Sequence, residues 1–236
     1  MDRVLTVPIR KFDLEVTAAN ALEDQDFLAV EEPLQIRIGS WDLAVTMRTP
    51  GNDEELAAGF LFTEGFIQKT SDIADIRCGR NTAVVTLSPE VQIDSSLQRN
   101  FYVTSSCGVC GKASIELLEK AGCIRLPSRP RVTETVIRSI PEKLGESQAI
   151  FKRTGGLHAS ALFSSEGELV SVREDVGRHN ALDKLIGMAL LDGRLPLHEY
   201  ILAVSGRTSF ELLQKAVMAG IPVLAAVGAQ IGRAHV

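Results

Sequence analysis

Short runs in which apolar and polar residues alternate dominate the first third of the chain. They cover residues 4–7, 27–30, 34–39, 41–47, 73–76 and 82–87. Alternation with a period of two predicts half-buried strands. The pair Gly39-Ser40, between two of these runs, favours a hairpin turn. The sequence therefore predicts a β-rich N-terminal region.

A helical pattern interrupts these strands after a Pro-Gly pair. Three consecutive acids at 53–55 stand where the positive end of a helix dipole favours negative charge. Asn52, directly before them, is a residue type whose side chain caps helix N-termini. We expect a helix from there to about residue 62–64. Its inward-facing side chains should be Leu56, Phe60 and Leu61.

Strand and helix patterns alternate in the second half of the chain. The expected strands are 100–104, 157–163, 169–173, 200–204 and 223–227, and the expected helices are 112–121, 134–144, 181–191 and 210–219. Successive strand–loop–helix units favour an α/β layer with at least one parallel pair of strands. We predict an α/β fold, α+β over the whole chain, with a β-rich region at 1–98 and an α/β core at 99–230.

The segment Thr104–Gly111 carries a CxxC pair, Cys107 and Cys110, between an expected strand and an expected helix. A helix N-terminus presents free N–H groups and a positive dipole end, which stabilise a thiolate. An effect of roughly 0.3–2 kcal/mol lowers a cysteine pKa by about 0.2–1.5 units, so a substantial fraction ionises near neutral pH. The alternative is a pair of unreactive cysteines at the edge of a core.

Charge and hydropathy argue against several classes of protein. A net charge of −5 with 5% aromatic residues does not fit general nucleic-acid binding, which needs a basic face and stacking rings. No apolar run approaches the ~18 residues of a membrane helix, and the first ten residues lack a signal-peptide layout. We expect a cytoplasmic protein that binds neither nucleic acid nor membrane. Cys78 and Cys123 have no spaced partner and should be unreactive.

The polar loop Ser205–Ser209 follows an expected strand and precedes an expected helix. In an open α/β sheet, anions bind at such a position. Arg207 could add bidentate contacts to a phosphate. The alternative is an ordinary Ser-capped helix with a solvated arginine.

A second polar loop, Asp175–Asn180, places an acid, a base, an imidazole and an amide before a helix. Gly177 would let a ligand approach closely, which favours a functional loop. In the structural alternative, Asp175 and Asn180 bind the N–H groups of the turn and the helix cap. Arg178 would then pair with an acid.

His158 invites a comparison with zinc deaminases, whose HxE and PCxxC motifs hold the metal. Here Ser160 stands at the position of the glutamate, no proline precedes Cys107, and the two motifs come in the opposite order. A single CxxC supplies only half of a structural zinc site. We therefore expect no bound metal.

Taken together, these segments resemble the FdhD family of formate dehydrogenase accessory sulfurtransferases. The resemblance rests on TPGNDEELAAGFLFTEGFI at 49–67, TSSCGVCGKASIE at 104–116, GGLHASALF at 155–163, REDVGRHNALDKLIG at 173–187 and SGRTSFELLQKAVMAGIPVLAAVG at 205–228. It implies a cytidine-deaminase-like α/β/α core and a cytoplasmic homodimer. It also implies a sulfurtransferase that receives sulfur from a cysteine desulfurase and passes it to the molybdenum or tungsten bis-molybdopterin guanine dinucleotide cofactor of formate dehydrogenase.

The resemblance assigns the persulfide to Cys107, with Cys110 as the companion thiol. We expect no permanently bound cofactor, because the guanine-nucleotide-containing cofactor is a transient acceptor. The phosphates of that acceptor should lie at the loop before the last helix, and the 175–180 loop should orient it. The candidate binding residues are Arg178, His179, Arg207, Thr208 and Ser209.

Two other functions use the same features. One is a thiol–disulfide oxidoreductase that uses the CxxC pair, and the other is a non-catalytic chaperone for the cofactor or the dehydrogenase. The last six residues, 231–236, match the translation of a common sequencing adapter, and family members continue with a further helix and strand. We therefore expect a C-terminally truncated chain in which 231–236 is an artefact and His235 has no role.

Overall fold

The computed structural model describes residues 2–11, 22–93 and 126–228. The strands within these ranges are β1 (Val4–Lys11), β2 (Leu22–Ala29), β3 (Glu32–Ile38), β4 (Trp41–Arg48), β5 (Ile73–Cys78), β6 (Thr82–Leu87), β7 (His158–Phe163), β8 (Leu169–Asp175), β9 (Ile201–Val204) and β10 (Val223–Ala226). The helices are α1 (Asp53–Thr63), η1 (Thr70–Asp72), α4 (Glu134–Ser147), α5 (Phe151–Thr154), α6 (Arg178–Leu191) and α7 (Phe210–Met218). The predicted mixed α/β class is confirmed.

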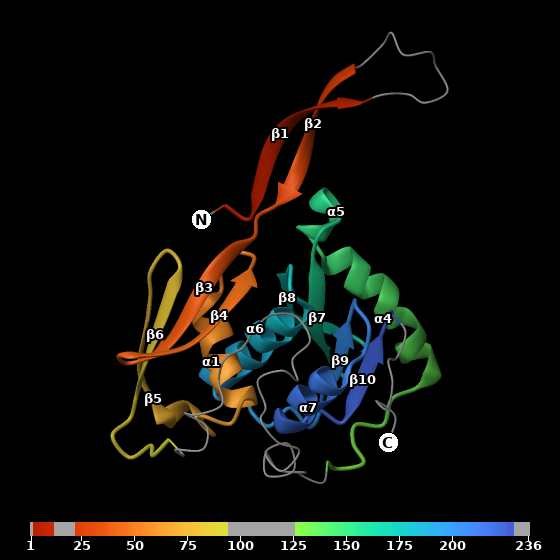
Figure 1. Cartoon of the computed structure of the whole chain (residues 1–236). Coiled ribbons are helices and arrows are strands. Elements are labelled where there is room, and N and C mark those ends of the chain that lie inside the picture. Colours follow the sequence, from red (N-terminus) through yellow and green to blue (C-terminus); the bar gives the residue numbers. More distant parts are fainter. Residues whose placement is uncertain (1, 12–21, 94–125, 229–236) are drawn as a thin grey trace.

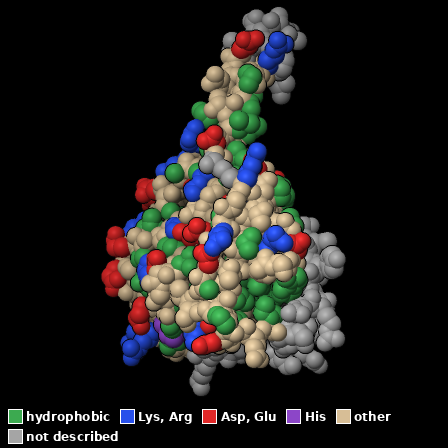
Figure 2. All heavy atoms as spheres, turned by 90° about the vertical axis from the view of Figure 1, so that its left-hand side faces the viewer, with side chains coloured by type: hydrophobic (Ala, Val, Ile, Leu, Met, Phe, Trp, Pro, Cys, Tyr) green, Lys and Arg blue, Asp and Glu red, His purple; other side chains and the backbone are tan. Residues whose placement is uncertain are grey.

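The N-terminal strands form a projecting hairpin and a four-stranded sheet (Figure 1). The hairpin is the antiparallel pair β1–β2, and the sheet has the order β4-β3-β6-β5. The predicted turn at Gly39-Ser40 is confirmed, because Ile38 pairs with Trp41 across it. The outer face of this sheet carries acidic and basic side chains mixed with apolar ones (Figure 2). Its other face packs on α1.

Helix α1 begins where the sequence predicts, but its cap differs from the prediction. Asn52 adopts a left-handed backbone with φ 59°, and its side chain makes no cap hydrogen bond. Instead Asn52 Oδ1 accepts a hydrogen bond from Arg3 Nη2 at 2.7 Å. Two acids of the first turn form ion pairs, Asp53 with Arg48, five residues before it, and Glu55 with Arg173 on β8. The expected cap is therefore absent, because the Asn52 side chain binds Arg3 instead.

The second sheet has the order β10-β9-β7-β8, and the predicted parallel pair is β9–β10. The two central strands, β7 and β9, are covered on both faces. Alternate residues of β7, including Leu162, face α6, while Ala161 and Phe163 face α4. Because burial on two faces removes alternation, this sheet shows an almost continuous apolar pattern in the sequence.

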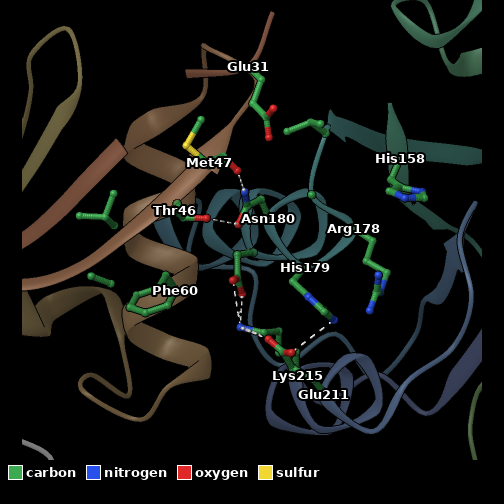
Figure 3. Close-up of a pocket in the computed structure, with 15 residues that line it drawn as sticks. Glu31, Thr46, Met47, Phe60, His158, Arg178, His179, Asn180, Glu211 and Lys215 are labelled. Atoms are coloured by element: carbon green, nitrogen blue, oxygen red, sulfur yellow. Dashed lines mark hydrogen bonds and ion pairs between the residues drawn. The ribbon is translucent and has the colours of Figure 1, made fainter. Parts of the chain in front are cut away.

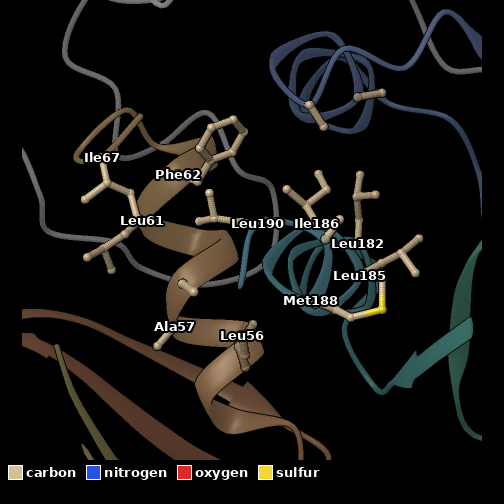
Figure 4. Packing of buried hydrophobic residues seen from close by; sticks show 14 of the residues in the cluster. Leu56, Ala57, Leu61, Phe62, Ile67, Leu182, Leu185, Ile186, Met188 and Leu190 are labelled. Carbon is tan, nitrogen blue, oxygen red and sulfur yellow. The ribbon is translucent and has the colours of Figure 1, made fainter. Parts of the chain in front are cut away.

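The two sheets share one hydrophobic core, built around the crossing of α1 and α6 (Figure 4). The helices approach so closely that a Cβ at position 59 would lie 1.9 Å from the Asp183 carbonyl oxygen. A Cβ at position 187 would lie 1.8 Å from the Glu55 carbonyl oxygen. Glycine is therefore the only residue that fits at Gly59 and Gly187 without moving a helix.

Several predictions fall on residues outside the described ranges. They concern the strand at 100–104, the helix at 112–121, the cysteines at 107, 110 and 123, and the segment 231–236. The domain division at residue 98 and the cytidine-deaminase-like character of the core stay predictions. In the part of the chain that the structure describes, no helix is both long enough and apolar enough to cross a membrane.

Candidate functional site

A pocket of about 390 Å³ lies between β4 and α1 on one side and the first turns of α6 and α7 on the other (Figure 3). The N-terminal sheet and the C-terminal sheet thus each supply one wall. The ionisable side chains that line it are Glu31, His158, Arg178, His179, Asp183, Glu211 and Lys215. The pocket joins loops that are far apart in the sequence.

Asp175 holds the pocket wall together from inside. Its Oδ2 accepts hydrogen bonds from Thr49 N at 3.1 Å and lies 2.7 Å from Lys184 Nζ. Its Oδ1 accepts from Gly177 N at 2.8 Å and from Asn180 Nδ2 at 3.1 Å. Asp175 is fully buried and Lys184 is 2% exposed. The carboxylate therefore has a structural role and no capacity left for a ligand.

Asn180 extends the same contacts to β4. Its Nδ2 donates to Met47 O at 2.7 Å, and its Oδ1 accepts from Thr46 Oγ1 at 3.1 Å. A Cβ at position 177 would lie 2.9 Å from Asn180 Nδ2. Gly177 does line the pocket, but the glycine is required by this internal contact and not only by an approaching ligand. For Asp175 the structural alternative is confirmed, because it accepts from the turn N–H of Gly177. Asn180 is also structural, but it binds β4 and Asp175 and not the N–H groups of the turn or the cap.

Arg178 behaves differently from its neighbours. Helix α6 begins at this residue, three positions before the predicted start at Ala181, so Arg178 and His179 belong to its first turn. The Arg178 Nε is buried, and no described residue accepts a hydrogen bond from it. No carboxylate of the described residues forms an ion pair with Arg178, so the pairing expected in the structural alternative is not found among them.

The loop before α7 packs beside Arg178. A Cβ at Gly206 would lie 3.2 Å from His158 Nδ1 and 3.7 Å from Arg178 Cδ. Arg207 is exposed, whereas Thr208 is 1% exposed and its Oγ1 has no hydrogen-bond partner among the described residues. The loop before α7 thus lies beside His158 and the first turn of α6, and Arg207 is near enough to His158 to influence its charge.

Ser209 does not cap α7, although it is the N-cap residue. Its side chain makes no cap hydrogen bond, and its Oγ lies 3.4 Å from His179 Nε2. The alternative of an ordinary Ser-capped helix is therefore wrong. The first N–H groups of α7 keep their capacity to bind an anion, because no side chain of Ser209 occupies them.

His179 is a neutral imidazole in this site. Burial, followed by the positive charges of Arg178 and Lys215, lowers the pKa of His179 to about 3. The Glu211 carboxylate lies 3.3 Å from His179 Nε2, but Glu211 also faces Lys215 at 3.8 Å. The negative charge of Glu211 is therefore shared between His179 and Lys215, and burial of the ring decides the protonation state of His179. His179 can serve as a hydrogen-bonding group, but it does not carry charge near neutral pH.

The floor of the pocket holds a buried ionic network that the sequence analysis did not identify. Lys215 Nζ contacts both Asp183 oxygens at 2.9 and 3.0 Å, and it donates to Thr63 Oγ1 at 2.8 Å. Burial opposes the charge of Lys215, but Asp183, Glu64 and Glu211 together raise its pKa above the ordinary value. The only sequence signal was a lysine on the apolar face of a helix, directly before the buried Ala216.

The cysteines assigned to sulfur chemistry, Cys107 and Cys110, lie outside the described residues. Cys78 is described and is exposed at the end of β5. Partial desolvation of its thiol, followed by the charges of Glu54 and Asp53, raises the pKa of Cys78 to about 11. A thiol of that pKa stays protonated and is a poor nucleophile near neutral pH.

The pocket fits an anionic group better than a metal ion. Within residues 2–11, 22–93 and 126–228, no three His, Cys, Asp or Glu side chains gather in a way that could hold a metal. The expectation that the chain binds no metal stays a prediction. The buried Arg178 Nε and Thr208 Oγ1 are donors for which the described residues offer no acceptor, and a phosphate supplies acceptor oxygens. The residues present therefore fit a phosphate-bearing ligand.

Comparisons with known proteins agree with one another. The model of the FdhD/NarQ family matches residues 29–235. A sulfur carrier protein FdhD of Streptomyces coelicolor is 54% identical, over 86% of this chain and 77% of its own length. Proteins of the same name from Mycolicibacterium paratuberculosis and Saccharolobus solfataricus are 49% and 44% identical, over 95% and 94% of this chain and 87% and 86% of their own lengths.

The fold also matches a solved structure. A crystal structure of a candidate formate dehydrogenase accessory protein from Desulfotalea psychrophila superimposes with a TM-score of 0.75, covering 99% of this chain and 87% of that one. At 22% sequence identity this match supports the fold alone. The family match and the identity to the curated relatives each span most of the sequence. The chain therefore belongs to the FdhD/NarQ family.

Proposed function

We propose that this protein is a sulfur carrier that serves formate dehydrogenase. It would take sulfur from a cysteine desulfurase as a persulfide on Cys107 and pass it to the bis-molybdopterin guanine dinucleotide cofactor, with Cys110 as the companion thiol. The observation that carries the proposal is the 54% identity to a protein named sulfur carrier protein FdhD, over 86% of this chain. We further propose a cytoplasmic homodimer.

The loading step needs no outside oxidant. The Cys107 thiolate attacks the outer sulfur of the donor's cysteine persulfide, and a new S–S bond forms as the donor S–S bond breaks. The donor cysteine leaves as a thiolate, so the number of electrons does not change. When the outer sulfur passes to an electron-rich acceptor, Cys107 returns to the thiolate form.

The described pocket supports the choice of acceptor. Arg178 and Arg207 supply positive charge, and the first turns of α6 and α7 supply free N–H groups. A guanine dinucleotide carries phosphates that match these donors. His179, as a neutral group, can orient the ligand by a hydrogen bond without adding charge.

Mass spectrometry of the intact protein tests the sulfur chemistry. After incubation with a cysteine desulfurase and cysteine, we expect one added sulfur atom, about 32 Da, on Cys107. Cys107→Ser should abolish it, whereas Cys78→Ser is the matched control and should leave it unchanged. A loss of about 2 Da that is reversed by thioredoxin would instead identify a thiol–disulfide oxidoreductase.

Complementation separates the carrier from a chaperone. In cells that lack their own copy of this protein, we expect formate dehydrogenase activity to depend on Cys107. Restoration of that activity by the Cys107→Ala variant would show that the chain acts without carrying sulfur. The variant Cys78→Ala serves as the control for protein level and folding.

A further inference from the structure

His158 lies between the two arginines of the phosphate site but is not among the residues that the sequence assigned to it. It is the first residue of β7, and its ring lines the pocket beside Arg178 (Figure 3). Its side chain is half-buried, and no described residue forms a hydrogen bond with the ring. The ring therefore keeps a donor and an acceptor that no described residue uses, and its Nδ1 edge lies beside Gly206 of the loop before α7.

Three charged side chains from three different segments act on His158. Arg178 comes from α6, Arg207 from the loop before α7, and Asp175 from β8, where it is the cross-strand partner of His158. His179, one residue after Arg178, is neutral. The Asp175 carboxylate is already paired with Lys184 at 2.7 Å. The two arginines therefore dominate the electrostatic potential at the His158 ring.

We propose that His158 is a third cationic ligand of the phosphate site, neutral in the free protein and protonated when a phosphoryl dianion binds between Arg178 and Arg207. Ligand binding is then coupled to the uptake of a proton. This inference rests on the phosphate site of the proposed function and adds to it the residue that makes binding depend on pH.

The protonation state follows from the geometry. In the free protein, the pKa of His158 is below its ordinary value. The largest cause is burial, and the positive charges of Arg178 and Arg207 lower the pKa further. A dianion placed between the arginines cancels their repulsion and adds an attractive partner, which raises the pKa of a neighbouring imidazole by about 1–3 units. The neutral ring thus becomes a donor only when the ligand is present.

The direction of the pH effect follows by linkage. Between the pKa of His158 in the free protein and its pKa in the complex, the complex holds more protons than the free protein. Affinity for the anion therefore falls as pH rises through this interval, by up to about tenfold per pH unit. Below the free-protein value, His158 is protonated in both states and affinity no longer depends on it.

NMR titration of the histidine rings in the full chain tests the proposal. Sulfate is the probe, because it stays a dianion from about pH 5 to 8, whereas a phosphate has its own pKa near 6. We expect saturating sodium sulfate to raise the pKa of His158 by about one unit or more relative to sodium chloride of equal ionic strength. His158→Gln identifies the signal, and Arg207→Ala should remove most of the shift.

The outcomes separate this inference from the proposed function. If sulfate shifts the backbone signals of residues 205–209 but leaves the titration of His158 unchanged, His158 is not a ligand and the phosphate site stands. If sulfate shifts neither, both ideas are wrong. His198→Gln, in the loop between α6 and β9, is the matched control and should leave the response to sulfate unchanged. Because the main measurement uses the unaltered chain, it does not depend on how a variant folds.

Discussion

Two groups of residues in one short loop illustrate different uses of polar side chains. Asp175 and Asn180 bind only other parts of the protein, and their contacts connect β8 and α6 to β4. Arg178, between them in sequence, has a buried Nε without an acceptor among the described residues. Satisfied polar groups hold the fold, whereas buried donors without partners indicate where a ligand supplies them.

Two buried threonines show the same contrast with matched chemistry. Thr63 and Thr208 are each 1% exposed. Thr63 Oγ1 donates to Asp183 Oδ1 at 2.8 Å and accepts from Lys215 Nζ at 2.8 Å, while no described residue is a partner of Thr208 Oγ1. One hydroxyl belongs to the internal network, and the other, in the loop before α7, has no partner among the described residues.

The largest effect should come from Asp175→Ala. Removal of this carboxylate leaves Lys184 as a buried charge without its partner and removes the acceptor of Thr49 N and Gly177 N. We expect the free energy of unfolding to fall by about 3–5 kcal/mol, measured by urea denaturation.

Two comparisons sharpen this prediction. The double variant Asp175→Ala/Lys184→Met should recover part of the loss, because it removes the unpaired charge. Arg138→Ala breaks an exposed pair with Glu134 and should cost less than about 0.5 kcal/mol. An Asp175→Ala protein as stable as the parent would contradict the structural role of this residue.

The variants Thr63→Val and Thr208→Val should change the free energy of unfolding by less than Asp175→Ala does. The two should also differ from each other. Thr63→Val removes a donor and an acceptor from a buried network, and we expect a loss of about 1–3 kcal/mol in unfolding free energy. Thr208→Val removes a hydroxyl that no described residue binds. The free energy of unfolding should therefore stay within about 0.5 kcal/mol of the parent value or rise.

In sulfate affinity, the two threonine variants should rank the other way: Thr208→Val should be the more affected. Thr208→Val should weaken sulfate binding severalfold, while Thr63→Val should leave sulfate affinity near that of the parent. Equal loss of stability in both variants would show that Thr208 also has an internal partner. Calorimetry of the full-length variants measures both quantities.

The smallest effect concerns the acid sensitivity of folding through His179. Its pKa is about 3 in the folded protein and near 6.5 in the unfolded chain, so the unfolded state binds more protons between these values. Stability is therefore lost as pH falls below about 6.5, by at most about 1.4 kcal/mol per pH unit for this group.

Replacement of His179 by glutamine removes this contribution. Unfolding free energies of the parent and of His179→Gln, measured at pH 7, 6 and 5, should differ in slope, with the variant less sensitive to acid. Parallel slopes would mean that the pKa of His179 is the same in the folded and the unfolded chain, and a parent that gains stability relative to the variant as pH falls would mean that the ring is protonated and paired with Glu211.

Local patterns in the sequence were sufficient for most secondary structure. Period-two alternation located β3 and β4, and the Gly39-Ser40 turn between them is confirmed. The two polar loops before α6 and α7 were also identified as candidate sites, because helix starts after strands are recognisable from neighbouring residues alone. The structure places these two loops beside each other, since Ser209 contacts His179 and Gly206 packs against Arg178; the assignment of the five residues to a ligand stays a prediction.

Strands, helices and the loops that carry polar groups could therefore be predicted from the chain alone, since they depend on contacts within a few residues. Which polar residues face inward depends on how the folded elements pack. Lys215 and Thr63 are 152 positions apart in sequence, and Gly59 meets α6 only because two helices cross. Such contacts arise when separate elements pack together, so no local pattern encodes whether Asp175 or Arg178 is left to bind a ligand.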